Sequence, residues 1–380
     1  MAVATASLER GARPAAGFGE WLDRHSGGIM VLPAVVIILA FAIFPLIVSA
    51  YLSLSRFALA PGGYKVTFVG LINFKKLLVG AQQYHFLGVF AAFSAVEWIL
   101  LALAWGLIGH WLLHYLRSGE IWLPGLVGRL ISALFAAGLA LLALATIVAG
   151  GFPGTLVTTL FYVLVGVGVQ FLLGLGLALL CAQPIRGRNW FRVIFFVPLM
   201  VTPVGIAYTF RMLADMEKGP LAPLRFALNL GEFAWATDPW LARIVVLVGE
   251  TWQWTPFMFI VLLAAVEAQP RDQVEAARID GANAFQVFRD ITWPAIAPVA
   301  ATVVLIRLIE AFKIVDLPNV LTNGGPGLAT ESMTLHSFIA WRTQDLGGSA
   351  AIGYILLFVS TVTCVSFFNY VVLPARRYQG

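Results

Sequence analysis

The chain has 380 residues, of which 60% are apolar and only 11% charged, and its mean hydropathy is +0.88. A soluble globular domain carries about 25% charged residues, so this composition excludes an ordinary soluble domain and indicates a polytopic helical membrane protein. The net charge of +5 does not indicate nucleic-acid binding, because positive charge in membrane proteins usually sets their orientation. Cys181 and Cys364 both lie inside apolar runs, which favours small buried side chains over a disulfide or a metal site.

Eight apolar runs are candidate membrane spans of an all-α fold. The runs cover residues 29–52, 86–114, 130–149, 156–182, 193–213, 241–268, 296–320 and 350–373. Prolines inside them, such as Pro33, Pro45 and Pro203, are tolerated because neighbouring helices satisfy the freed carbonyl groups. The first run is too long for a signal-peptide core, so we expect a retained first span.

Basic residues divide unequally between the two sets of loops. If the N-terminus is cytoplasmic, the cytoplasmic face receives most of the arginines, including Arg10, Arg13 and Arg24 at the start and Arg376 and Arg377 at the end. The positive-inside rule and an even number of spans then place both termini in the cytoplasm. The longest external loops are 53–85, 214–240 and 321–348. The last contains 323–327 (NGGPG), which predicts a specified turn that either shapes an external mouth or simply joins two spans.

The most polar segment of the second half runs from Glu275 to Pro294 and reads EAARIDGANAFQVFRDITWP. The pattern predicts two short helices joined at Gly281, with Asn283 capping the second. Because apolar spans hold it on both sides and the charge pattern puts it in the cytoplasm, this segment suits docking onto a soluble partner.

Motifs that carry chemistry are scarce. The sequence contains no GxxxxGK[ST] phosphate loop, so the chain has no evident means of binding ATP. His110 and His114 have helical spacing but are too few ligands for a metal, and we expect them to be interfacial or packed. Gly174, Ala178 and Ala182 predict a face on which another helix packs closely.

Two polar groups lie within the apolar runs. The seventh run carries Arg307, Glu310, Lys313 and Asp316. Charge inside a membrane is a functional hypothesis, and two alternatives remain open: substrate contact, or an internally paired network that positions the helix. Trp252, Gln253 and Trp254 are expected near the external end of the sixth run, where they either bind a sugar or belong to an interfacial aromatic belt.

The Glu275–Pro294 segment resembles the EAA loop of binding-protein-dependent ABC importer permeases, whose pattern is EAA, three residues, Gly, nine residues, Ile, one residue, Leu-Pro. Glu275-Ala276-Ala277, Gly281, Ile291 and Pro294 fit this pattern, and Trp293 replaces the leucine. Segments 68–78, 186–204 and 312–327 are similar to the sugar-permease branch of maltose and glycerol-phosphate importers. The similarity covers 154–373 and fails at 85–153, where two extra spans make an eight-span variant.

The resemblance implies a type I ABC importer permease fold in a bacterial inner membrane, with both termini cytoplasmic. It divides the chain into an N-terminal segment 1–28, a first span and external loop 29–84, an extra hairpin 85–153, a permease core 154–373 with the coupling loop 270–295, and a tail 374–380. The implied partners are a second homologous permease, two cytoplasmic ATPase subunits, an extracytoplasmic sugar-binding protein and membrane lipid. ATP and Mg would bind the ATPase subunits, so the chain itself would carry no cofactor, metal or catalytic residue.

The resemblance also implies two sets of site residues. Coupling to the ATPase would use the polar segment, with Glu275 facing basic ATPase residues: Glu275, Ala276, Ala277, Asp280, Gly281, Ala282 and Phe285. The substrate pathway would use polar and aromatic residues of the later spans: Tyr208, Trp252, Gln253, Trp254, Glu310, Lys313 and Asp316. An ion-coupled secondary transporter using Glu310, Lys313 and Asp316 is the alternative function, and a membrane-bound enzyme is a third.

Overall fold

The computed structural model describes residues 18–117, 122–184, 186–227 and 235–377. It separates into two units, Met1–Leu52 and Ser53–Gly380. Arg10, Arg13, most of the expected N-terminal segment 1–28 and the last residues of the expected tail, 378–380, lie outside the described residues.

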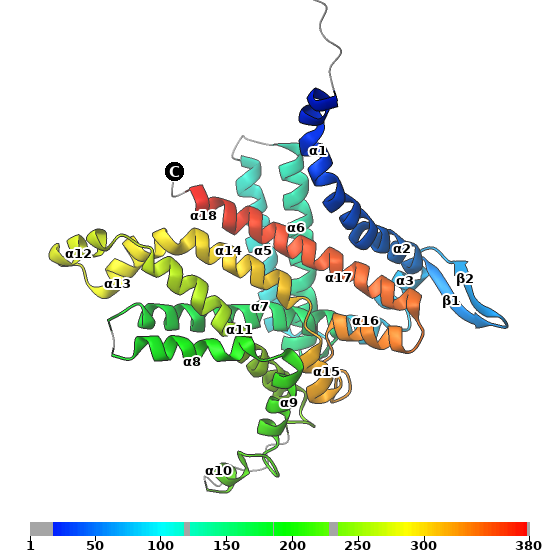
Figure 1. Ribbon diagram of the computed structural model, residues 1–380. Helices are drawn as coiled ribbons and strands as arrows, with labels where there is room; N and C mark the ends of the chain where they lie inside the picture. Colours follow the sequence, from blue (N-terminus) through cyan, green and yellow to red (C-terminus); the bar gives the residue numbers. More distant parts are fainter. Residues whose placement is uncertain (1–17, 118–121, 185, 228–234, 378–380) are drawn as a thin grey trace, which may run out of the picture. The chain divides into compact units, whose positions relative to one another are not determined.

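Helices dominate both units (Figure 1). The first unit consists of α1 (Phe18–Ile38), η1 (Leu39–Ile43) and α2 (Phe44–Ser53), which ends at the unit boundary. The second unit begins with β1 (Ser55–Ala60), β2 (Gly63–Phe68), α3 (Ile72–Leu78), α4 (Gln83–Phe86), β3 (Gly88–Val89), α5 (Ala95–Arg117), α6 (Leu123–Ala143), η2 (Leu144–Val148) and β4 (Phe152–Pro153). It continues with α7 (Thr155–Cys181), α8 (Arg188–Met200), α9 (Pro203–Ala214), α10 (Ala222–Ala227), α11 (Pro239–Glu267), α12 (Arg271–Ile279), α13 (Ala284–Val287), η3 (Phe288–Thr292), α14 (Trp293–Ala311), α15 (Asp316–Thr322), α16 (Met333–Arg342), α17 (Leu346–Phe367), η4 (Phe368–Val372) and α18 (Leu373–Arg377).

Within the described residues, seven helices are long and apolar enough to cross a membrane, or eight if the bent pair α8 and α9 forms one span. The predicted all-α polytopic fold is therefore confirmed. The fifth span is broken rather than continuous, with a bend of 101° between Met200 and Pro203. Pro203 removes a backbone donor at the point where α9 begins, and Thr202 caps α9 by accepting a hydrogen bond from the backbone N–H of Gly205.

Several other span boundaries differ from the prediction; the third span, for example, begins at Leu123, not at residue 130. The second span begins at Ala95, not at residue 86, because α4 and β3 occupy the residues before it. The seventh span covers Ala284–Ala311 and so does not continue to residue 320. Hydropathy extends across the start of the second span and the end of the seventh, since the intervening residues are mostly apolar but belong to short elements and turns outside the spans.

The extra hairpin is closed at its base by a pair of short strands. β3 pairs antiparallel with β4, with Gly88 opposite Pro153. The two ends of the hairpin that contains α5 and α6 therefore lie side by side. Gly88 has a φ of +112°, and a Cβ there would lie 2.3 Å from the backbone oxygen of Phe152, so this close approach requires glycine.

One helix of this hairpin packs on the rest of the bundle. Ser132 on α6 hydrogen-bonds Ser366 on α17, with their Oγ atoms 2.7 Å apart. The Arg129 guanidinium lies 4.0 Å from the ring centroid of Tyr115 and 5.1 Å from those of Trp111 and Tyr370, an arrangement that stabilises the cation. A structural role of α6 is thus to pack against α17, a role that the sequence left open.

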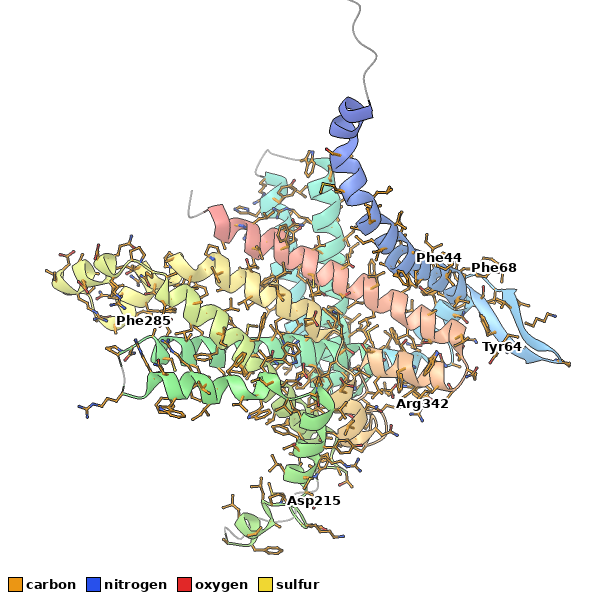
Figure 2. All side chains as sticks on the ribbon, in the orientation of Figure 1. Phe44, Tyr64, Phe68, Asp215, Phe285 and Arg342 are labelled. Carbon is orange, nitrogen blue, oxygen red and sulfur yellow. The ribbon has the colours of Figure 1, made fainter. Side chains whose placement is uncertain are left out.

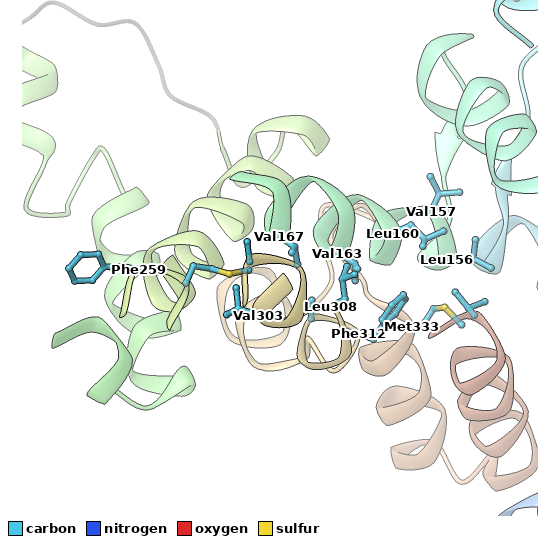
Figure 3. Packing of buried hydrophobic residues seen from close by; sticks show 14 of the residues in the cluster. Leu156, Val157, Leu160, Val163, Val167, Phe259, Val303, Leu308, Phe312 and Met333 are labelled. Atoms are coloured by element: carbon cyan, nitrogen blue, oxygen red, sulfur yellow. The ribbon is translucent and has the colours of Figure 1, made fainter. Parts of the chain in front are cut away.

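The main hydrophobic core lies between α7, α11, α14 and the residues that follow α14 (Figure 3). Val163 and Val167 on α7 are buried with Val303 and Leu308 on α14. The predicted close-packing face of α7 is confirmed at Gly174 and Ala178. Ala178 is fully buried, and a Cβ on Gly174 would lie 2.5 Å from the Cβ of Met258 on α11.

Gly174→Val is expected to destabilise the bundle by about 1–3 kcal/mol, the usual cost of overpacking a well-filled core. The added atoms would also meet the backbone nitrogen of Phe259 at 3.0 Å, so α7 and α11 must separate. The thermal-unfolding midpoint of the protein in detergent measures this effect. Gly176→Val is the matched control, because nothing lies within 4 Å of a Cβ at Gly176 on the same helix. Equal midpoints for the two variants would contradict the prediction.

Candidate functional site

The α12–α13 segment, residues 271–287, connects α11 to α14 and forms two short helices as predicted. Gly281 lies between them with a φ of +84°, in the left-handed region that glycine occupies without strain. Asn283 caps α13 in a reciprocal arrangement. Its Oδ1 accepts a hydrogen bond from the Gln286 backbone N–H at 2.9 Å, and its own N–H donates to Gln286 Oε1 at 2.8 Å.

This segment presents an exposed surface at one end of the second unit (Figure 1). None of the residues of α12 is buried. Two large apolar side chains, Ile279 and Phe285, are 86% and 67% exposed, and Phe285 projects from α13 in Figure 2. Of the predicted coupling residues, Glu275, Ala276, Asp280 and Gly281 are exposed, while Ala277 and Ala282 are half-buried. A surface that combines exposed apolar side chains with charge is typical of a docking site.

The segment is firmly attached to the helices on both sides. The η3 turn leads from α13 directly into α14 without a break. Trp293, which replaces the leucine of the EAA pattern, lies with its ring centroid 6.4 Å from that of Phe171 and 6.2 Å from that of Phe288. At the other side, Arg192 of α8 forms an ion pair with Glu267, the last residue of α11. A displacement of the segment would therefore be passed to these helices.

A buried ion pair and a hydrogen bond from its arginine join three of the long helices. Arg307 on α14 pairs with Glu250 on α11 through its Nη2 atom, and its Nε–H donates to Gln170 Oε1 on α7 at 2.8 Å. Arg307 is 1% exposed and Glu250 is 5% exposed. Trp254 lies over the guanidinium, 4.4 Å from ring centroid to Cζ. This Arg307–Glu250–Gln170 cluster is a paired network that positions helices, one of the two alternatives left open for Arg307.

The other charged residues expected on the seventh span do not join this cluster. Glu310 accepts a hydrogen bond from Lys313 at 2.8 Å, and the two side chains are 41% and 64% exposed. Lys313 follows the last residue of α14, Ala311, and Asp316 begins α15. Placing Lys313 and Asp316 inside the seventh span was therefore wrong, because the helix ends before them.

The aromatic and amide residues on α11 lie near the middle of this helix, so placing them near its external end was also wrong. Trp252 is 42% exposed and Gln253 is 4% exposed. Trp252 and Trp254 are two positions apart and so point in directions about 200° apart on a helix. Trp252 continues an exposed stripe at every fourth position with Ile244 and Val248, whereas Trp254 packs over Arg307. Tyr208, on α9, is 56% exposed.

Sequence reasoning missed Glu250 and Gln170. Each is an isolated polar residue in a long apolar run, a signal that indicates a buried partner. The external turn, in contrast, was predicted. Asn323, Gly324 and Gly327 all have positive φ values of 50°, 86° and 59°, and the Gly325–Pro326 bond is cis.

Residues 171–378 match the family described as binding-protein-dependent transport system inner membrane component. The trehalose/maltose transport system permease protein MalF of Thermococcus litoralis is 34% identical over 221 residues, which are 58% of this chain and 73% of that protein. The probable starch degradation products transport system permease protein AmyD of Thermoanaerobacterium thermosulfurigenes is 28% identical over 193 residues, 50% of this chain and 65% of that protein. A solved bacterial ABC transporter involved in the import of the acidic polysaccharide alginate contains a chain with the same fold. The TM-score is 0.61 and the identity 16%, with 94% of this chain and 98% of that chain covered.

Proposed function

This chain belongs to the family of binding-protein-dependent transport system inner membrane components, and from this premise we propose that it is the permease subunit of an ATP-driven importer for a sugar or sugar derivative. The names of relatives, which include trehalose/maltose and starch-degradation-product permeases, support the sugar class. The observation that carries the mechanism is the exposed α12–α13 segment, which connects two bundle helices without burying any residue of α12.

In this proposal the α12–α13 segment docks into a cytoplasmic ATPase subunit. The apolar side chains of Ile279 and Phe285 lose water contact in the complex, and the exposed Glu275 carboxylate faces basic groups of the partner. Gly281 lets the two helices meet at a sharp angle and leaves its backbone open to close approach, since nothing lies within 4 Å of a Cβ at this position. Closure of the ATPase dimer would then push the segment and rock the attached helices.

The chain supplies one half of the translocation pathway. A second homologous permease would complete the pathway, and two ATPase subunits would hold ATP and Mg, because this sequence has no phosphate loop. An extracytoplasmic sugar-binding protein would deliver the substrate to the end of the bundle opposite the α12–α13 segment. These assignments place the protein in a bacterial inner membrane. It is a non-catalytic subunit, since hydrolysis takes place on the partners.

The exposed members of the predicted pathway are the better candidates for substrate contact. Tyr208, Trp252, Glu310 and Lys313 present side chains at the surface, where a facing permease would enclose them. Gln253 is buried within this chain, and the half-buried Trp254 packs over Arg307, so Trp254 supports the Arg307–Glu250–Gln170 cluster. Asp316 is half-buried at the start of α15.

The ion-coupled alternative depends on ionisable groups at depth in the membrane. Lys313 and Asp316 follow the end of α14, and Glu310 pairs with Lys313, so these residues give a proton or ion relay little support. Uptake into proteoliposomes containing the purified complex separates the two mechanisms. We expect uptake that requires ATP on the ATPase side and persists when ion gradients are collapsed. Uptake that follows an ion gradient without ATP would overturn the proposal.

Trp252→Ala and Tyr208→Ala are each expected to weaken uptake at limiting substrate by about fivefold, because an aromatic contact is worth roughly 1 kcal/mol. Tyr208 is 56% exposed, so its substitution should leave the thermal-unfolding midpoint unchanged. Trp252 also packs on Phe210, with ring centroids 5.8 Å apart, so its substitution should lower the midpoint slightly. Trp98→Ala is the control, since Trp98 is 59% exposed on the extra hairpin. Uptake kinetics equal to those of the control would remove Trp252 and Tyr208 from the pathway.

A further inference from the structure

Three metal-ligating side chains converge at the end of the second unit opposite the α12–α13 segment. His85 comes from α4, Glu331 from the loop before α16, and His336 from α16 itself. One potential ligand atom from each residue lies within 4.8 Å of the others. Glu331 and His336 are five positions apart, whereas His85 is far from both in the sequence, so the sequence gives no sign of the cluster.

Burial separates this cluster from ordinary surface histidines and carboxylates. Glu331 is 2% exposed and His336 is 5% exposed, and the His85 side chain is 19% exposed. His85 Nε2 and Glu331 Oε1 lie 3.1 Å apart, but they are not aligned as a hydrogen bond and neither atom has another hydrogen-bond partner in the described part of the chain. Burying two polar atoms that do not hydrogen-bond to each other costs free energy, and a cation bound by both atoms would offset this cost.

The separation of His85 Nε2 and Glu331 Oε1 fits a transition-metal ion. Ligand atoms bound to Zn²⁺ at 2.0–2.2 Å in a tetrahedron are separated by about 3.3–3.6 Å, slightly more than the 3.1 Å between His85 Nε2 and Glu331 Oε1. Two imidazoles and a carboxylate form a donor set that suits Zn²⁺ better than Mg²⁺ or Ca²⁺, which prefer oxygen ligands. Three protein ligands leave one position of the tetrahedron for water.

The surroundings hold His336 as metal sites commonly hold a ligand. His336 Nδ1 lies 3.3 Å from the Oγ1 atom of Thr155, which leaves Nε2 as the metal-binding nitrogen. Ser332 caps α16, and its hydroxyl donates to the Ile314 carbonyl oxygen at 2.6 Å.

We propose that His85, Glu331 and His336 form a Zn²⁺ site on the extracytoplasmic side of the protein. The ion would join α4 and the loop before α5 to α16 and the 323–332 turn. In the structure the two imidazole rings are stacked, with centroids 3.9 Å apart and planes 15° apart. Nearly parallel rings cannot direct both lone pairs at one point, so binding requires one imidazole to turn about its terminal side-chain torsion, which is a soft motion.

The direct test is zinc binding by the purified, chelator-stripped complex, measured by competition with a chromophoric chelator. We expect one Zn²⁺ per chain, not displaced by excess Mg²⁺ or Ca²⁺. His85→Ala, Glu331→Gln and His336→Ala should each remove this binding. Thr155→Val keeps the shape of the side chain but removes the orienting hydroxyl, and it should weaken binding by about 10–100-fold.

His110→Ala and His114→Ala on α5 are the matched controls, because both histidines are exposed and lie outside the cluster; neither should change zinc binding. Zinc should also raise the thermal-unfolding midpoint of the wild type and the controls but not that of the three ligand variants. Binding that survives in Glu331→Gln and His336→Ala, or a wild type that binds no more zinc than these variants, would overturn the proposal. So would equal competition by Ca²⁺. A ligand variant that fails to fold leaves Thr155→Val and the calcium competition as decisive measurements.

Discussion

Arg307→Met is expected to destabilise the protein by about 3–5 kcal/mol, the cost of leaving one member of a buried ion pair without its partner. The substitution keeps an apolar side chain of similar length, but the Glu250 carboxylate, 5% exposed, loses its cation and Gln170 loses its donor. Trp254 also loses the cation beneath its ring. The thermal-unfolding midpoint of the protein in detergent should fall by several degrees.

The double variant Glu250→Met/Arg307→Met separates the cost of an unpaired charge from the cost of lost packing. Because a buried pair can often be replaced by apolar side chains of similar volume with little loss, the double variant should recover most of the lost stability. Arg342→Met is the matched control, since Arg342 lies exposed on α16 (Figure 2). A midpoint for Arg307→Met as high as that of the control would show that the cluster does not hold the helices together.

Glu275→Lys is expected to reduce ATP-driven uptake to background while leaving the permease folded and inserted. The side chain is exposed on α12, so the change removes no buried contact of this chain. In the proposed complex it places a like charge against the basic groups of the ATPase, and juxtaposed like charges cost several kcal/mol at an interface. Substrate-stimulated ATP hydrolysis and co-purification of the ATPase are the two measurements.

The control for this charge reversal is Glu217→Lys, because Glu217 is also exposed but lies beyond α9. It should leave ATPase co-purification unchanged, because Glu217 lies in the external loop 214–240 and not at the ATPase side. If Glu275→Lys couples hydrolysis to uptake as well as the wild type does, the α12–α13 segment does not carry the ATPase interaction at this residue.

The features that could be predicted from the sequence are those that depend on neighbouring residues. Spans follow from the length of an apolar run, and the α12–α13 segment follows from one glycine and one capping asparagine. The close approach at Gly174 follows from a repeat of small residues. Each of these signals lies within about thirty consecutive residues.

The features that could not be predicted depend on residues far apart in the chain. Glu250 and Arg307 are separated by 57 positions, and Gln170 is 137 positions from Arg307. Hydropathy carries no information on the direction of the chain, so it could not distinguish the bent pair α8 and α9 from a straight span. For the same reason it could not locate the end of α14 within the apolar residues around it. The pathway residues were predicted from their polarity and expected depth. The structure shows that some of these side chains are exposed and that others are buried or half-buried within the chain.

The position of the Arg307–Glu250–Gln170 cluster along α11 also determines how far each end of this helix would travel in the proposed transport movement. At 1.5 Å per residue, Glu250 lies about 26 Å along α11 from Glu267, beside the α12–α13 segment, and about 17 Å from Pro239 at the other end. If α11 rocks as a rod with its fulcrum at the cluster, every 3 Å of travel at the ATPase end becomes roughly 2 Å of opposite travel at the external end. The external end of α11 would thus move a shorter distance than the end beside the α12–α13 segment, but with correspondingly greater force.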